Sequence, residues 1–441
     1  MTPIPIRLLL LAALGLGVQP LRSATEVQAR IASEYPSLEA LYKDLHLHPE
    51  LSLQEVNTSA RIAAELRSAG FEVTEKFGGT GVVGVLRNGP GPTLLIRTDM
   101  DALPVKEDTG LAYASTVRSV NLSGAEVPVM HACGHDIHMT VFIGTARTLS
   151  ALKDRWSGTV VLVGQPAEEF VVGARNMLTA GLYRQFPRPD FAIGLHDTSD
   201  IAAGQVGFAE GPFTSNSDSV DITVRGIGGH GSRPEVTKDP IVLAAQIVLA
   251  LQTIVSREVH PGDRAVVTVG TIHGGLKNNI IPDEVKLQLT LRSYDSAVRE
   301  HLIASIRRIC RGEAIAAGVP EDLMPIVTLV GSSADSIYND PALTRRVRAA
   351  VAGMLGADKV VAAEPLMGSE DFSQFGRTVE KVPLCFFELG AYPAEKIAES
   401  RRTGVALPFL HSSKFAPIPE PTIKTGIAAM TAAALDLLPK N

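Results

Sequence analysis

The chain has 441 residues, which is more than one ordinary hydrophobic core needs and predicts about two domains. A hydrophobic fraction of 45% and a charged fraction of 20% are typical of a globular protein. The net charge is -6, and no run of Lys or Arg is present that would follow phosphates or anionic lipid. We therefore expect no nucleic-acid partner.

The N-terminus differs from the rest of the chain. Arg7 precedes an apolar run over residues 8–18, Pro20 ends the run, and the small residues Ser23 and Ala24 follow. This layout is typical of a secretory signal peptide, here residues 1–24, and predicts a periplasmic or secreted protein. The alternative interpretation is a buried N-terminal helix. The run is too short for a permanent membrane span, and no other segment looks apolar enough, so we expect no stable membrane insertion.

The segment after the N-terminus alternates strands with helices. Apolar residues at helical spacing predict helical structure over residues 34–70, with Pro49 ending the first helix. Strands are predicted at residues 81–86, 93–98, 158–164 and 191–195, and helices at 139–152 and 175–180. This alternation predicts an α/β domain with a largely parallel sheet, whose first part is residues 25–212.

The pattern changes in the middle of the chain. Strands are predicted at residues 220–225, 265–272, 284–293 and 325–330, and helices at 239–257 and 296–317. The order β-α-β-β-α-β is the split βαβ, or ferredoxin-like, pattern. We therefore predict an inserted α+β domain over residues 213–325. A helix at 341–355, a strand at 383–389 and a helix at 423–438 return the chain to the first domain over residues 326–441.

Five short segments carry side chains suited to chemistry, and three of them directly follow predicted strands. In chain order they contain Asp99 and Asp101, Cys133 and His135, Glu168 and Glu169, His196 and Asp197, and finally His411. Ligands of open α/β sheets collect at the carboxyl ends of the strands, so these segments can converge on one edge.

The residue types suit a metal. Thiolate, imidazole and carboxylate are the usual zinc ligands, and they also suit manganese, cobalt or nickel. The chain has three cysteines, so at least one thiol stays unpaired, and Cys133 lies between His131 and His135. A loop at Gly134 lets Cys133 and His135 face the same side. Because a thiolate can bridge two cations, this set would serve a site with two divalent metals, zinc being the first choice.

The adjacent pair Glu168 and Glu169 adds a base. Neighbouring carboxylates on a loop point in different directions, so one can bind metal while the other takes a proton from water. The alternative interpretation is an acidic pair favoured before the start of a helix. The position after a buried strand, together with the Cys/His cluster, favours the catalytic interpretation.

Six motifs, in order and spacing, resemble one family over nearly everything after about residue 34. They are Leu45-His-Leu-His-Pro-Glu50, Asp99-Met-Asp-Ala-Leu-Pro104, Met130-His-Ala-Cys-Gly-His-Asp136, Gln165-Pro-Ala-Glu-Glu169, Gly368-Ser-Glu-Asp-Phe372 and Leu410-His-Ser412. The chain resembles the hippurate hydrolase and indole-acetyl-amino-acid hydrolase branch of the aminoacylase and carboxypeptidase metallopeptidases. The segment around Cys133, followed by Pro-Ala-Glu-Glu, is the most specific part.

The resemblance implies a role for each matched residue. The metal ligands would be Cys133, His135, Glu169, His196 and His411, with Cys133 bridging two ions. Glu168 falls on the position of the catalytic base. Asp99 and Asp101 would orient ligands or accept hydrogen bonds from backbone amides, and His138 and Glu370-Asp371 would support the site. For His46 and His48 we favour a structural role.

The inserted domain would carry substrate contacts and form a homodimer or higher oligomer. His230, in Gly228-Gly-His-Gly231, would stabilise the oxyanion in its own or the partner subunit's site. Asn279 and Arg292 match positions near the substrate carboxylate, although Arg292 could equally be an exposed strand residue.

The expected activity is hydrolysis of the amide bond of N-acyl amino acids, small-molecule substrates, to a carboxylic acid and a free amino acid. The alternatives are a dipeptidase or carboxypeptidase, and a non-catalytic binding protein. The chain departs from the family pattern at Ser232-Arg-Pro-Glu235 and in a long segment over residues 391–407, both of which bear on substrate size.

Overall fold

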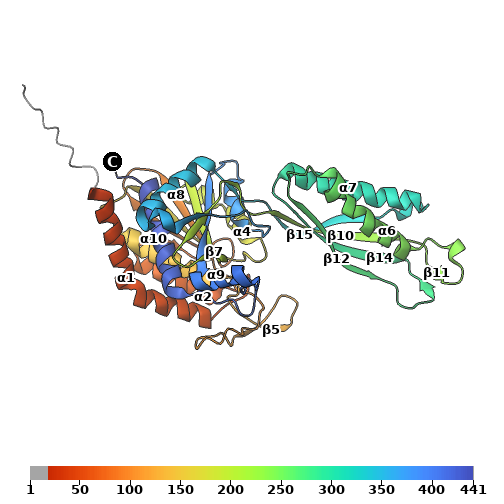
Figure 1. Cartoon of the computed structure of the whole chain (residues 1–441), viewed down its shortest axis with the longest axis horizontal. Helices are drawn as coiled ribbons and strands as arrows, with labels where there is room; N and C mark the ends of the chain where they lie inside the picture. Colours follow the sequence, from red (N-terminus) through yellow and green to blue (C-terminus); the bar gives the residue numbers. More distant parts are fainter. Residues whose placement is uncertain (1–17, 441) are drawn as a thin grey trace, which may run out of the picture.

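The computed structural model describes residues 18–440, with side chains from residue 24. Most of the predicted signal peptide therefore lies outside the described residues, and export stays a prediction. The described chain forms two lobes joined by extended segments, the larger at the left of Figure 1 and the smaller at the right.

A ten-stranded sheet runs through the larger lobe. Its central strands are β6 (Gly158–Gln165), β3 (Thr93–Asp99), β7 (Phe191–Ala202) and β18 (Leu384–Tyr392), and neighbours among them are parallel. The other strands are β1 (Glu72–Thr74), β2 (Val82–Asn88), β8 (Val206–Phe208), β9 (Gly211–Pro212), β16 (Tyr338–Asn339) and β17 (Val360–Ala362). Helices cover both faces, so the central strands are continuous apolar runs rather than alternating ones. The predicted α/β class with a largely parallel sheet is confirmed.

Helices pack on each side of this sheet. The main core is filled by α1 (Val18–Leu47), α2 (Val56–Ser68), α3 (His135–Ala151), α8 (Pro341–Leu355) and α10 (Pro419–Leu437). A second core lies under α4 (Gly173–Thr179), α5 (Leu182–Gln185) and the short helix η5 (Asp371–Gly376).

The helical region predicted over residues 34–70 is two helices, because residues 48–55 are not helical. Pro49 lies in this break, and the carboxylate of Glu50 accepts the backbone N–H groups of Asn57 and Thr58 at 3.1 and 2.8 Å. These two N–H groups at the start of α2 have no partner within the helix, so Glu50 satisfies them.

The smaller lobe is the inserted domain. Its sheet has the order β12-β14-β10-β15 with every pair antiparallel, and it is built from β10 (Asn216–Arg225), β12 (Ala265–Gly274), β14 (Glu284–Ser293) and β15 (Ile326–Ala334). Helices α6 (Pro240–Thr253) and α7 (Ser296–Ala316) pack on it. This is the predicted split βαβ arrangement. Strand β15 begins at Ile326, just after the predicted boundary at residue 325, and its pairing with β10 places it in the small sheet.

The remaining elements are short. They are β4 (Arg118–Val120), β5 (Glu126–Pro128), β11 (Gly229–His230), β13 (Ile280–Ile281), α9 (Ala394–Thr403), and the single turns η1 (Pro234–Val236), η2 (Ile254–Glu258), η3 (Glu321–Leu323) and η4 (Ala357–Lys359).

One helix passes the length and composition test for a membrane span, contrary to the expectation that no segment after the N-terminus would. It is Pro240–Glu258, formed by α6 and η2. Packing within the domain accounts for much of the apolar character of this helix, because Leu243, Ile247 and Leu251 fill the core between it and the small sheet. Its opposite side leaves Leu249 73% exposed.

Candidate active site

The five predicted metal ligands come together near the carboxyl ends of β3 and β6. His196 does not follow the end of a strand, as predicted, but lies within β7, which continues to Ala202. Sγ of Cys133 lies 3.4 Å from Nε2 of His196 and 3.4 Å from Nε2 of His411. Nε2 of His411 lies 3.4 Å from Oε2 of Glu169. The ligand atoms of Cys133, His135 and His196 lie within 4.8 Å of one another, and so do those of Cys133, Glu169 and His411. Cys133 therefore belongs to two groups of three ligands.

Unpartnered polar atoms show that this cluster fits cations. Nε2 of His135 and Oε1 of Glu169 are buried and have no hydrogen-bond partner among the described residues. Buried polar atoms in folded proteins almost always have one. Burial, followed by the charges of Glu169 and Glu168, raises the pKa of the Cys133 thiol well above its usual value. A divalent cation reverses this effect because it stabilises the thiolate.

The second nitrogen of two of the imidazoles, those of His135 and His196, is held by the backbone. Nδ1 of His135 donates to the carbonyl oxygen of Asp101 at 2.7 Å, and Nδ1 of His196 donates to the carbonyl oxygen of Asp197 at 2.8 Å. These bonds fix the tautomer and leave Nε2 free toward the cluster, the arrangement typical of histidine ligands to metals.

His411 reaches the cluster from a loop after β18. Its backbone N–H donates to the carbonyl oxygen of Ala132 at 2.8 Å, which holds it beside Cys133. Its φ of 67° lies in the left-handed region, which a non-glycine residue adopts at a cost of about 1 kcal/mol. Such backbone strain is common at functional sites.

Glu168 is the free carboxylate beside the ligands. Burial raises its pKa well above the usual value, and the charges of Glu370 and Glu169 raise it further. A raised pKa suits a group that takes up and returns a proton near neutral pH. The turn before it is held by Glu55, which accepts the backbone N–H of Ala167 at 2.8 Å.

Asp101 fixes the backbone of the Glu168-Glu169 pair. Its Oδ1 accepts the N–H of Glu168 at 3.1 Å, its Oδ2 accepts the N–H of Glu169 at 3.0 Å, and Ser52 donates to Oδ2 at 2.6 Å. Asp99 instead accepts from Nδ1 of His138 at 2.7 Å. The carboxylates of Asp101 and Asp99 are both held in these hydrogen bonds, so neither is free to act as a base.

Arg97 is a site residue that sequence reasoning passed over. Its buried guanidinium contacts Asp99 at 2.7 Å, Glu370 at 2.7 Å and Asp371 at 3.3 Å. It therefore joins the end of β3 to the start of η5. A charged residue inside the apolar strand Thr93–Asp99 was the available signal, since a buried charge requires partners.

Of the predicted substrate-binding residues, one lies in the cavity of the ligand cluster. Arg292, on β14, lines this cavity of about 270 Å³ together with Cys133 and Glu168. Its Nη1 donates to Oγ of Ser369 at 3.1 Å. It is the single Lys or Arg among the described residues that line this cavity.

His230 and Asn279 lie elsewhere. Both line a separate hollow, and the β11 strand that carries His230 is at the end of the small lobe far from the large one (Figure 1). The backbone N–H of Gly231 donates to the carbonyl oxygen of Asn279 at 2.9 Å, so the two loops form one unit. Asn279 and Arg292 therefore do not lie together within one chain, contrary to the prediction that both are near the substrate carboxylate. Asn279 directly precedes β13, ahead of the start of β14, whereas Arg292 is next to the last residue of β14.

Comparison with known proteins agrees with this geometry. Residues 95–402 match Peptidase family M20/M25/M40, and the chain belongs to this family. It is 37% identical to Thermostable carboxypeptidase 1 of Saccharolobus solfataricus, over 88% of this chain and 92% of the relative. It is also 37% identical to Hippurate hydrolase of Campylobacter jejuni subsp. jejuni, over 76% of this chain and 84% of the relative.

A solved structure extends the likeness to three dimensions. A Bacillus subtilis protein, described as a dinuclear metal binding peptidase from the M20 family, superposes with a TM-score of 0.73 at 30% identity and covers 91% of this chain and 98% of its own. The resemblance seen in the motifs is confirmed, and the chain is a metal-dependent amidohydrolase or peptidase.

Proposed function

We propose that this enzyme hydrolyses the amide bond of N-acyl amino acids, of the hippurate-like or aromatic conjugate type, to a carboxylic acid and a free amino acid. The observation that carries this proposal is the shared cavity of Arg292, Glu168 and the ligand cluster. A guanidinium in the cavity suits the carboxylate of an amino acid, because it binds carboxylates through paired hydrogen bonds.

The ligand set would hold two divalent cations, zinc first, with Cys133 shared between them. The groups Cys133, His135, His196 and Cys133, Glu169, His411 support this assignment, as does the dinuclear B. subtilis structure. When bound, such a pair of cations lowers the pKa of water and polarises a carbonyl group.

The chain's own residues then move protons and orient the substrate. Glu168 accepts a proton from water as the water oxygen bonds to the amide carbon. It delivers that proton to the leaving nitrogen as the carbon–nitrogen bond breaks, which gives a neutral amine and a carboxylic acid; the acid then passes its proton to the amine or to solvent. Arg292 holds the carboxylate of the leaving amino acid.

We further propose a homodimer in which His230 serves the partner's site. The position of His230 at the far end of the small lobe supports this, because it does not contact the cluster of its own chain. The exposed side of α6, including Leu249 and Val242, supplies apolar surface on the same lobe for such contacts. His230 would then stabilise the oxyanion of the tetrahedral intermediate. Export to the periplasm or medium remains part of the proposal and rests on residues 1–24.

A carboxypeptidase or dipeptidase is the second candidate. The same Arg292 would hold the C-terminal carboxylate of a peptide, and the S. solfataricus relative is called a carboxypeptidase. The two candidates differ in whether the acyl half is a simple carboxylic acid or an amino-acid residue.

The test is amine release from a panel of N-acyl amino acids and dipeptides, with enzyme that has been stripped by chelation and reloaded with zinc, manganese, cobalt or nickel. We expect release from N-benzoyl and N-acetyl amino acids to exceed release from dipeptides. Glu168→Gln should lower kcat by about 10²- to 10⁴-fold and keep the metal content. Faster turnover of dipeptides would favour the second candidate, and normal turnover by Glu168→Gln would disprove the role of Glu168.

A further inference from the structure

A second cavity adjoins the one that contains the ligand cluster. It has a volume of about 990 Å³, and the two cavities share Leu366, Glu388 and Phe409 in their walls. Part of its wall comes from helix α9, Ala394–Thr403, which lies in the long segment between β18 and His411. A molecule held at the cluster can therefore extend past these three residues into a larger space.

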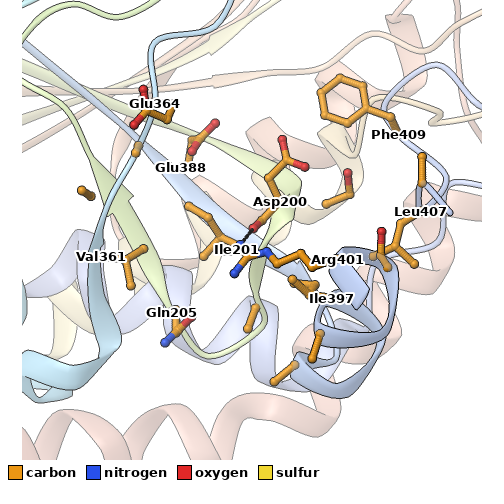
Figure 2. A pocket seen from close by; sticks show the side chains of 18 of the residues that line it. Asp200, Ile201, Gln205, Val361, Glu364, Glu388, Ile397, Arg401, Leu407 and Phe409 are labelled. Atoms are coloured by element: carbon orange, nitrogen blue, oxygen red, sulfur yellow. Dashed lines mark hydrogen bonds between the residues drawn. The ribbon is translucent and has the colours of Figure 1, made fainter. Parts of the chain in front are cut away.

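This second cavity is acidic. Among the described residues that line it, the charged ones are Asp200, Glu364 and Glu388, and Arg401 is the one Lys or Arg. Figure 2 shows the three carboxylates gathered in one part of the cavity. Nη2 of Arg401 donates to the backbone carbonyl of Asp200 at 3.2 Å, and none of the three carboxylates forms an ion pair within the described part of the chain.

Glu388 is the residue that distinguishes this cavity from an ordinary acidic surface. It lies on the central strand β18, the residue is 4% exposed, and its Oε1 has no hydrogen-bond partner among residues 24–440. Burial raises its pKa to about 8, and the charge of Asp200 adds to this effect. A buried carboxyl without a partner is costly, and a cation in the cavity would remove that cost.

The remaining walls suit an alkyl chain. Ile397, Leu407 and Val361 line the cavity with apolar side chains (Figure 2), and Phe409 lies at its junction with the active-site cavity. A methylene chain can contact these residues while a charged end reaches the carboxylates.

We propose that the second cavity is a subsite for a positively charged group, an ammonium or guanidinium, at the end of the substrate's acyl half. The proposal rests on the proposed function, in which Arg292 holds the carboxylate of the amine half. The acyl half then extends away from Arg292, toward Phe409 and Glu388.

Two matched substrates test this subsite. N-(6-aminohexanoyl)phenylalanine and N-heptanoylphenylalanine have acyl chains of equal length and differ in a terminal ammonium against a methyl group. We expect the metal-loaded enzyme to prefer the charged substrate by about tenfold in kcat/KM, mainly through a lower KM, the size of effect that one partly buried charge pair produces. Glu388→Gln should reduce this ratio to about one. Glu395→Gln, an exposed change on α9 that does not line the cavity, should leave the ratio intact.

Binding to the Glu168→Gln variant, measured by calorimetry, separates the subsite from the activity. Tighter binding of the charged ligand that disappears in the Glu168→Gln, Glu388→Gln double variant supports the subsite even if wild-type enzyme hydrolyses neither compound, an outcome that would disprove the proposed function alone. Equal binding and equal turnover of the two compounds would overturn the subsite while leaving the function standing. A preference for N-heptanoyllysine over N-heptanoylnorleucine, without one for the aminohexanoyl compound, would also overturn it, because the charge would then be recognised in the amine half.

Discussion

Gly134 lies directly against the carboxylate of Asp197. Its φ is 75°, in the left-handed region, and a Cβ built on it would overlap both carboxylate oxygens of Asp197. Gly134 separates the ligands Cys133 and His135, while Asp197 follows the ligand His196. The close approach of these two residues therefore couples the turn that carries Cys133 to strand β7, which carries His196.

Gly134→Ala should consequently weaken both the fold and metal binding. The left-handed backbone alone costs about 1 kcal/mol for alanine, and displacing Asp197 adds about 1–3 kcal/mol. We expect a lower Tm and a lower metal content per chain, measured by calorimetry and elemental analysis. Gly110→Ala is the matched control, because Gly110 has a φ of 74° and no atom within 4 Å of the added Cβ. Equal effects of the two changes would show that the contact with Asp197 is unimportant.

Removing the thiolate of Cys133, the proposed bridging ligand, should remove the metals. Cys133→Ala deletes the one ligand atom common to both groups of three, so we expect less than one metal ion per chain after dialysis, by elemental analysis. Cys310→Ala, a change in the buried core of the small lobe, should keep the full metal content. A fully metallated Cys133→Ala protein would refute the bridging role.

Asp101→Ala should affect kcat far more than KM. The change leaves the N–H groups of Glu168 and Glu169 without their acceptor, so the base and a ligand lose their fixed positions. Changes of this kind around metal ligands typically cost about 10- to 100-fold in metal affinity or activity. Steady-state kinetics at saturating metal would reveal the loss in kcat. Asp108→Ala, whose side chain is exposed, provides the comparison, and an Asp101→Ala enzyme as active as this control would contradict the positioning role.

His46 should make stability depend on pH in the alkaline range. Burial acts to lower its pKa, but hydrogen bonds and charge from Asp136 and Glu107 outweigh burial and raise the pKa to about 10. The folded state therefore binds the proton more tightly than the unfolded state, whose pKa is about 6.5. The stabilisation is complete below about pH 6.5 and is lost as the pH rises toward 10, on the order of a few kcal/mol in total. His46→Gln should flatten this dependence in unfolding curves taken between pH 6 and pH 10. His48→Gln, at an exposed position, should not.

Mixing two inactive variants tests whether His230 acts in the partner's site. Neither Glu168→Gln nor His230→Ala homodimers should be active. A mixed dimer would contain one site with both an intact Glu168 and an intact His230. Random exchange gives such dimers half of the population, so about a quarter of wild-type activity should return. No recovery after confirmed subunit exchange would place His230 outside the partner's catalytic machinery.

Much of the larger lobe could be predicted from the sequence because its strands are continuous apolar runs with acidic or imidazole side chains directly after them. Asp99 and Gln165 mark the ends of β3 and β6, and the edge they form is the one the alternation of strands and helices predicted. His196 lies at this edge within β7, which continues to Ala202. Cys133, His135, Glu169 and His196 could be picked out as candidate ligands because each is a metal-binding type near a predicted strand or helix end. His411 lies in the loop between α9 and α10, and the resemblance of the motif Leu410-His-Ser412 implied its role.

Other features depend on contacts far apart in the chain and left little local signal. Arg97 meets Glu370 across 273 positions, and only the fold brings the two together. Helix α9 lies in the long segment over residues 391–407, for which no helix was predicted; its sequence has many charged residues and few apolar ones. In the sequence, Glu388 is one polar residue within an apolar strand. The lack of a hydrogen-bond partner for its Oε1 depends on the folded arrangement of β18 and its neighbours, which the local sequence does not indicate.

The burial of the three cysteines bears on how the folded protein reacts to an oxidising environment. All three are buried and unpaired, Cys310 within the small lobe, Cys385 within the main core and Cys133 at the ligand cluster. Because thiol exchange requires an accessible thiolate, an oxidising compartment can form wrong disulfides in this chain only before folding is complete, and a bound cation on Cys133 would shield the thiol nearest the surface. Folding and metal loading together would thus act as the chain's protection against cross-linking, a protection that stripping the metal in air would partly remove.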